Sequence, residues 1–152
     1  IREVEAEHLA SVRVTCAMAE LPAVMGGVFG RIMGALRAEG VQPSGGAVVI
    51  YHGWTEDTVD AEIGFTIHGV FFPQDRHSDI RPSHVPGGKV AFTTHVGEYD
   101  GLERAYKAIQ AYAEANGLEL GKTMWERYLT DPAVEPDLSK HVTEVFWPLA
   151  GR

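Results

Sequence analysis

The sequence reads Met124-Trp125-Glu126-Arg127-Tyr128-Leu129-Thr130-Asp131-Pro132 over residues 124–132. Bulky and aromatic residues followed by Asp-Pro are typical of a strand that ends in a turn. Because side chains alternate along a strand, Glu126 and Tyr128 are expected on one face and Trp125 on the other. A carboxylate framed by aromatic rings suits a pocket for a flat or cationic molecule, since both groups attract positive charge.

Length and composition indicate one globular domain, residues 1–152. At 152 residues the chain is long enough for one core but not for two independent ones. Its composition, 45% hydrophobic and 22% charged, is ordinary for a globular protein. Its single cysteine, Cys16, excludes an internal disulfide and fits a reducing cytoplasm. The 13 Lys and Arg against 21 Asp and Glu, without a basic run, argue against direct nucleic-acid binding. No apolar run reaches the length of a membrane span.

The first half of the chain predicts a strand, a helix and two further strands. Residues 9–18 predict the first strand, and the three- and four-residue apolar spacing that follows predicts a helix ending at Gly40. Four glycines weaken this helix by propensity, and we expect them to let its backbone lie close to a sheet. Strands over 47–52 and 59–68 follow, joined by a hairpin turn at 53–57.

The same order recurs in the second half. A strand over 89–96 precedes a helix that opens with the capping box Asp100-x-x-Glu103 and closes at Gly117. Strands over 123–130 and 142–147 complete it. When the halves are superimposed, Gly40 aligns with Gly117 and Tyr51 with Tyr128, while residues 61–63 align with 143–145.

These patterns predict an α+β fold made of two strand-helix-strand-strand repeats. Repeat one spans about 9–68 and repeat two about 89–149, and residues 69–88 are expected to form a long crossing loop. We expect the repeats to be related by a pseudo-twofold axis and to form an antiparallel sheet. A central ligand cleft is expected where they meet, because ligand sites favour such junctions.

Three segments carry a resemblance to a known family. They read His95-Val96-Gly97-Glu98-Tyr99-Asp100-Gly101-Leu102, then 125–132 as quoted above, and finally Thr143-Glu144-Val145-Phe146-Trp147-Pro148-Leu149. In order and spacing they resemble the gyrase-inhibitor-like (GyrI-like) small-molecule-binding domain. That domain also serves as the effector-binding half of multidrug-responsive transcription regulators. The resemblance covers nearly the whole chain.

The resemblance implies a pocket for lipophilic, often cationic or aromatic compounds, with its acidic residue at Glu126. One subset of the family hydrolyses strained cyclopropane-bearing toxins and carries a Trp-Glu pair that matches Trp125-Glu126. Three functions therefore stay open: a stand-alone drug- or toxin-binding protein, a detoxifying hydrolase, and the ligand-sensing half of a transcription regulator. The last requires a DNA-binding domain before residue 1. The natural ligand and the oligomeric state are left open.

Nine residues are candidates for the ligand site: Glu126, Tyr128, Tyr51, Trp54, Trp125, Tyr99, Glu144, Phe146 and Trp147. Trp125 and Tyr51 can instead be core residues, and Tyr99 can instead pack at the entry of the second helix. Glu144 serves either the site or the surface, whereas its match, Glu62, is expected on a solvated strand face. One of Phe146 and Trp147 should line the cleft, because their side chains point to opposite faces. Trp54 is expected in an exposed turn.

If the protein is an enzyme, Glu126 is the expected general base or acid, with Tyr128 or Tyr99 as a proton donor. An apolar setting raises the pKa of a carboxyl toward neutrality and suits it to activating water. The seven histidines show no ligand spacing such as H-x-x-x-H, and one cysteine makes no zinc pattern. We therefore expect no metal and no cofactor.

Overall fold

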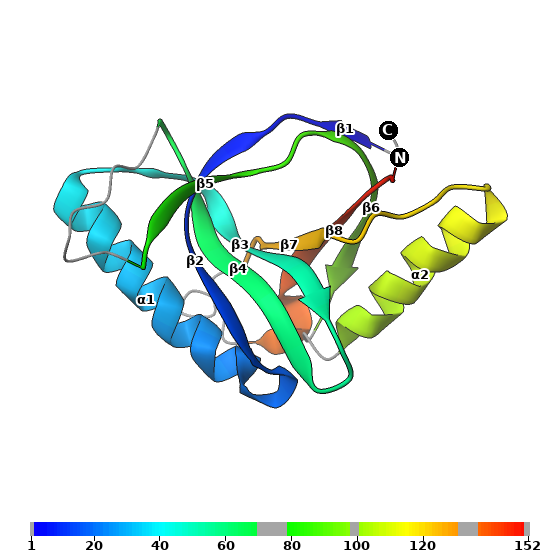
Figure 1. The fold of residues 1–152 in the computed structure, drawn as a ribbon, viewed down its shortest axis with the longest axis horizontal. Coiled ribbons are helices and arrows are strands. Elements are labelled where there is room, and N and C mark those ends of the chain that lie inside the picture. The colour runs from blue at the N-terminus through cyan, green and yellow to red at the C-terminus, as the bar shows by residue number, and fades with distance from the viewer. Residues whose placement is uncertain (1, 70–78, 98–100, 131–136, 151–152) are drawn as a thin grey trace.

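The computed structural model describes residues 2–69, 79–97, 101–130 and 137–150. In these residues, two α-helices flank one antiparallel sheet that curls between them (Figure 1). The elements follow the chain as β1 (Arg2–Val4), β2 (Glu7–Ala17), α1 (Leu21–Glu39), β3 (Pro43–Trp54), β4 (Thr58–Ile67), β5 (Arg81–Val85), β6 (Gly88–Val96), α2 (Leu102–Ala115), β7 (Met124–Tyr128) and β8 (Val142–Pro148). Short 3₁₀ turns lie at Met18–Glu20 and Leu138–Lys140.

The strand order shows the expected two-part arrangement. Across the sheet it runs β1-β6-β8-β7-β3-β4-β2-β5, and all pairs are antiparallel. The central strands β3 and β7 are neighbours, and the order outward from them is β3-β4-β2 on one side and β7-β8-β6 on the other. In each half a helix follows the outer strand in the chain, α1 after β2 and α2 after β6. This is the order that a twofold axis between β3 and β7 produces.

The edge strands tie the two halves together. β1 precedes β2 in the chain but pairs with β6, whereas β5 precedes β6 but pairs with β2. The expectation of a loop throughout 69–88 was therefore wrong for residues 81–85. Their sequence, Arg81-Pro82-Ser83-His84-Val85, lacks apolar alternation and contains a proline. Proline is tolerated in a strand at the edge of a sheet, which is where β5 lies.

The turns and caps match expectation in part. Gly40 and Gly117 have φ values of 71° and 65°, so a left-handed glycine follows each helix as expected. Trp54 belongs to β3 and pairs with Val59, which limits the hairpin turn to residues 55–57. The N-cap of α2 is Gly101, without a side-chain cap hydrogen bond, and Asp100 of the expected capping box lies outside the described residues.

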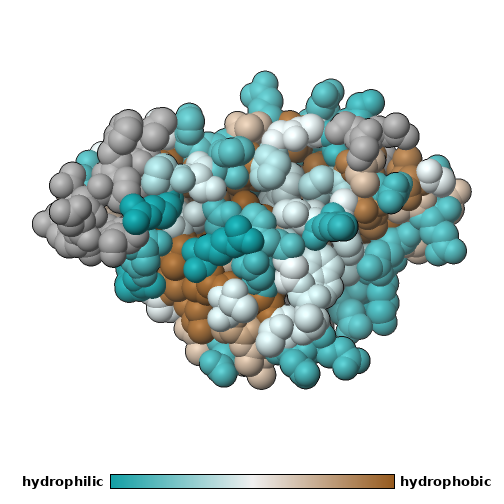
Figure 2. Space-filling view, in the orientation of Figure 1, coloured by the Kyte–Doolittle hydropathy of each residue, from teal (hydrophilic) through white to brown (hydrophobic). Residues whose placement is uncertain are grey.

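The glycines of α1 face away from the sheet, contrary to expectation. Their positions, Gly26, Gly27, Gly30 and Gly34, are exposed, and a Cβ added at any of them would meet nothing within 4 Å. The helix packs on the sheet with the opposite stripe, through Val28, Ile32 and Leu36. Figure 2 shows apolar surface in its lower left part, where Figure 1 places α1.

The core is divided between the two faces of the sheet. One cluster joins α1 to Val49 and Ile63, and a second joins α2 to Met124 and Val145. Tyr51 contacts both clusters, so both helices cover the same face. A third cluster, built on Val48, Ile50, Trp125 and Phe146, fills the opposite face. Neither described helix combines the length and apolar character needed to cross a membrane.

Candidate functional site

The carboxyl group of Glu126 lies in the middle of the helix-covered face. β7 holds it opposite Val49 of β3 at the centre of the sheet, and the residue is only 1% exposed. Three phenol hydroxyls donate hydrogen bonds to it from three different elements. Tyr128 of β7 and Tyr51 of β3 reach Oε1 at 2.6 and 3.2 Å, and Tyr106 of α2 reaches Oε2.

Burial dominates the electrostatics of this group. Desolvation raises the pKa of Glu126 from 4.5 to about 7, although the hydrogen bonds from Tyr128 and Tyr51 act in the opposite direction. Burial and the neighbouring Glu126 carboxylate raise the pKa of both tyrosines above the ordinary value of 10.0, so the phenols stay protonated and act as donors. The raised carboxyl pKa agrees with the sequence expectation.

No basic side chain among the described residues neutralises Glu126. The ion pairs formed by the described residues do not include it, and its hydrogen-bond donors are neutral. A buried carboxylate without a cation is unfavourable, and it is relieved by a proton or by a positively charged partner. The group can therefore bind a cation, or it can take and release a proton near neutral pH.

Glu126 also lies next to the pseudo-twofold axis. Gly40 and Gly117 are 77 residues apart, and so are Tyr51 and Tyr128. The same separation relates Val49 to Glu126, and these two residues are register partners across β3 and β7. The axis therefore passes between Val49 and Glu126. Tyr51 and Tyr128 are symmetry mates that approach one carboxyl oxygen from the two halves of the sheet.

Tyr106 is the site residue that sequence reasoning missed. It lies on the apolar stripe of α2, where Ala105 and Ile109 are buried, and a place on such a stripe indicates a packing residue. The available signal was its hydroxyl, because a buried tyrosine usually finds a hydrogen-bond partner. The position 77 residues earlier is Phe29, which has no such group and packs edge-on against Phe65 at 5.4 Å.

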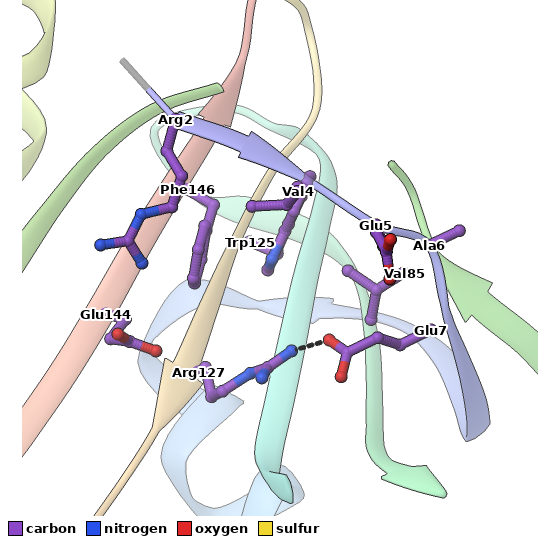
Figure 3. Close-up of a pocket in the computed structure, with 10 residues that line it drawn as sticks. All are labelled: Arg2, Val4, Glu5, Ala6, Glu7, Val85, Trp125, Arg127, Glu144 and Phe146. Carbon is purple, nitrogen blue, oxygen red and sulfur yellow. Dashed lines mark hydrogen bonds and ion pairs between the residues drawn. The ribbon is translucent and has the colours of Figure 1, made fainter. Parts of the chain in front are cut away.

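Three predicted site residues lie on the opposite face, in a pocket of about 340 Å³ (Figure 3). Trp125 and Phe146 stack at 5.4 Å with their planes 14° apart, and both are almost fully buried. Glu144 lies beside them on β8, opposite Arg127 of β7. Of the alternatives for Trp125, the structure shows the core position, on the face turned away from Glu126.

Two of the remaining candidates, Trp147 and Trp54, pack against each other. Trp147 lies in the α2 cluster on the helix-covered face, and its indole Nε1 donates to the carbonyl oxygen of Gly121 at 2.8 Å. Trp54 packs edge-on against it at 6.0 Å and is 45% exposed. Tyr99 lies outside the described residues. Among those described, no group of three His, Cys, Asp or Glu residues could hold a metal ion.

Glu62, the match of Glu144, differs from the solvated residue that was expected. It is 8% exposed, and its carboxylate accepts a hydrogen bond from Ser11 at 2.6 Å and contacts His52 Nε2 at 2.8 Å. Hydrogen bonding and the nearby histidine hold the pKa of Glu62 below its ordinary value despite the opposing effect of burial, which is the largest single influence. A solvated strand face was therefore the wrong expectation for this position.

Comparison with known proteins supports the resemblance. The model of the GyrI-like small molecule binding domain matches residues 1–150. No curated protein sequence matches the chain. Among solved structures, the EcmrR C-terminal domain superimposes with a TM-score of 0.83 at 19% identity, covering 97% of this chain and 94% of that one. EcmrR in its complex with DNA gives 0.84 and 19%, and this chain spans only 55% of that longer chain.

Two further solved structures share the fold at lower similarity. SAV2435 bound to tetraphenylphosphonium has a TM-score of 0.63 and 11% identity, covering 99% of this chain and 92% of that chain. A hydrolase from Listeria innocua has the same score and identity, covering 98% and 90% respectively. At these identities, the structural likeness establishes the fold alone.

Proposed function

Because the chain belongs to the GyrI-like small-molecule-binding domain family, we propose that it captures lipophilic, aromatic monocations with Glu126 as their counter-charge. The single observation that carries this proposal is the buried Glu126 carboxyl, which three neutral phenols hold and no described basic side chain neutralises. The structural neighbour bound to tetraphenylphosphonium supports this ligand class.

The physical argument begins with the charge. An ionised carboxylate at this depth is unfavourable until a cation accompanies it, so a cationic ligand gains more here than a neutral one of equal shape. The rings of Tyr51, Tyr106 and Tyr128 add favourable contacts, because aromatic faces attract cations. Apolar groups of the ligand are stabilised further by leaving water.

The same arrangement couples binding to proton release. With its pKa near 7, Glu126 is partly protonated at neutral pH, and a cation must displace that proton. Affinity should therefore rise with pH. For a carboxyl with this pKa, the ionised fraction grows from about 0.1 at pH 6 to about 0.9 at pH 8, which corresponds to about a tenfold gain in affinity.

The site must open for a ligand to enter, because Glu126 is 1% exposed. The hydroxyl of Tyr106 covers Oε2 from α2, while Tyr51 and Tyr128 belong to the central strands. A shift of α2 relative to the sheet would uncover one carboxylate oxygen and leave the other held by Tyr51 and Tyr128.

The test is calorimetric titration with tetraphenylphosphonium and with its neutral analogue triphenylphosphine oxide, at pH 6 and pH 8. Glu126→Gln should weaken the cation strongly, leave the neutral compound nearly unchanged and abolish the pH dependence. Glu144→Gln is the matched control, since it removes a carboxylate from the opposite face. Equal losses for both compounds, or equal effects of the two substitutions, would contradict the proposal.

A hydrolase is the second candidate, favoured by one specific observation. Glu126 combines a pKa of about 7 with a Tyr128 hydroxyl 2.6 Å away, so a general base and a proton donor lie side by side. The fold is shared with a protein described as a hydrolase. Here Glu126→Gln should bind a cyclopropane-bearing electrophile without converting it. Recovery of every such compound unchanged from the wild-type protein would leave capture as the function.

The regulator hypothesis rests on the likeness to EcmrR, whose chain is nearly twice as long in the DNA complex. In that case ligand capture at Glu126 would be the sensing step of a larger protein. Sequencing the gene upstream of residue 1 tests this hypothesis, because it requires an encoded DNA-binding domain.

A further inference from the structure

The pocket on the opposite face is separate from the Glu126 site. β7 presents consecutive side chains to opposite faces, so Glu126 points to the helices whereas Trp125 and Arg127 line this pocket. Figure 3 shows β1 and the link into β2 passing over one side of it, with β7 and β8 on the other. Its volume of about 340 Å³ falls within the range of small-molecule sites.

The pocket contains a donor without an acceptor. Arg127 uses Nη2 to pair with Glu7, and its guanidinium lies 6.0 Å from the centre of the Phe146 ring. Its Nε is closed to water and has no hydrogen-bond partner among the described residues, so a ligand oxygen reaches it only when the Arg127 side chain shifts toward the pocket. A buried guanidinium N–H without an acceptor is uncommon and points to a missing carbonyl or carboxylate oxygen.

The pocket also contains an acceptor without a donor. Glu144 is the cross-strand partner of Arg127, so both side chains lie on one face about 5 Å apart at Cβ. Its carboxylate forms no hydrogen bond or ion pair with the described residues, and Figure 3 shows it free of dashed contacts. At the matched position in the first half, the carboxylate of Glu62 is held by Ser11 and His52.

The charge balance narrows the ligand class. The lining holds two arginines, Arg2 and Arg127, and three glutamates, Glu5, Glu7 and Glu144. Because the net charge of the lining is near −1, the pocket does not favour an anion. The guanidinium of Arg127 lies beside the carboxylate of Glu144 and disfavours a cation there. A neutral group with a hydrogen-bond acceptor next to a hydrogen-bond donor can pair with both Arg127 Nε and the Glu144 carboxylate. A primary carboxamide is the simplest such group.

We propose that this pocket is a second small-molecule site and binds a planar aromatic carboxamide. The carbonyl oxygen accepts from Arg127 Nε, the amide N–H₂ donates to Glu144, and the ring lies between Phe146 and Val4. β1 forms the outer wall and is attached by its pairing to β6 and by Arg2, whose guanidinium lies 3.9 Å from the centre of the Phe92 ring. The site does not depend on the cation site.

The test is a titration with benzamide, sodium benzoate and benzylamine. Binding is monitored through the NMR signals of the Trp125 indole and of the backbone of β7 and β8. Benzamide should bind more tightly than either charged analogue. Arg127→Lys keeps the charge that pairs with Glu7 but removes the Nε donor, and it should weaken benzamide about tenfold. Glu144→Val, which keeps a strand-forming side chain, should weaken it similarly.

Glu126→Gln is the matched control because it changes the neighbouring residue on the other face. It should leave benzamide affinity unchanged within twofold, just as Arg127→Lys should leave tetraphenylphosphonium affinity unchanged. The proposal is overturned if benzamide leaves the β7 and β8 signals unmoved, or if benzoate or benzylamine binds as tightly. It is also overturned if benzamide affinity survives both Arg127→Lys and Glu144→Val.

Discussion

The buried carboxyl of Glu126 should make the protein less stable as the pH rises. In the folded protein the pKa of this group is about 7, against 4.5 for an ordinary Glu. Between these values the folded state keeps a proton that the unfolded state releases, so the stabilising effect is complete below 4.5 and is lost as the pH passes 7. With about 1.4 kcal/mol per pKa unit, the total loss from burying this group is about 3 kcal/mol.

Glu126→Gln isolates this effect, because every other titrating group is common to both proteins. Gln remains neutral and keeps a carbonyl oxygen for the hydroxyls of Tyr51 and Tyr128, while its amide can donate to the oxygen of Tyr106. The free energy of unfolding of the variant, relative to wild type, should increase by about 2 to 3 kcal/mol between pH 5 and pH 8.

Urea unfolding followed by circular dichroism at intervals of one pH unit measures this difference. The reasoning would be refuted by parallel curves for the two proteins, which would mean that the pKa of Glu126 is the same in the folded and unfolded states. A difference of the opposite sign would mean that the hydrogen bonds from the tyrosines outweigh burial.

Two further predictions concern single side chains. Tyr106→Phe removes a donor that favours the charged carboxylate, so the pKa of Glu126 should rise and the fraction of Glu126 that is ionised at pH 7, followed by NMR, should fall. Tyr112→Phe on the exposed side of the same helix should change nothing, and an equal loss there would contradict the assignment. Gly64→Ala should destabilise the protein by about 3 kcal/mol in urea unfolding, because its Cβ would lie 2.3 Å from a backbone oxygen of β2. Gly53→Ala, with open space around it, is the matched control, and similar values for both would argue against the β2–β4 contact.

The helices and inner strands could be predicted because each carries a local signal. The apolar stripe of α1 recurs in α2 with the same separation as the two terminal glycines, so Val28, Ile32 and Leu36 match Ala105, Ile109 and Ala113. Alternation correctly separated Glu126 and Tyr128 from Trp125. These inferences need only the periodicity of one element at a time.

The rest could not be predicted because it depends on contacts between distant elements. β1 and β5 are short, polar edge strands whose pairing is set by the other half of the chain. Tyr106 looks like any residue of an apolar stripe until α2 is placed over β7. The faces of Glu144 and Phe146 could not be assigned relative to Glu126, because alternation within β8 does not say which of its faces lies beside Glu126. The register between β7 and β8 decides this.

The pseudo-twofold axis explains why only one half carries the central carboxyl. Symmetric positions usually tolerate the same residue, as Tyr51 and Tyr128 do, because these side chains stand on either side of the axis. Val49 and Glu126 are different, since they face one another across β3 and β7, with Cβ atoms about 5 Å apart. Two carboxylates at that distance in a buried site could not both ionise. The second would stay protonated and would weaken the attraction for a cation. A charge placed on the axis must therefore come from one repeat alone, which leaves an apolar residue as the compatible partner at position 49.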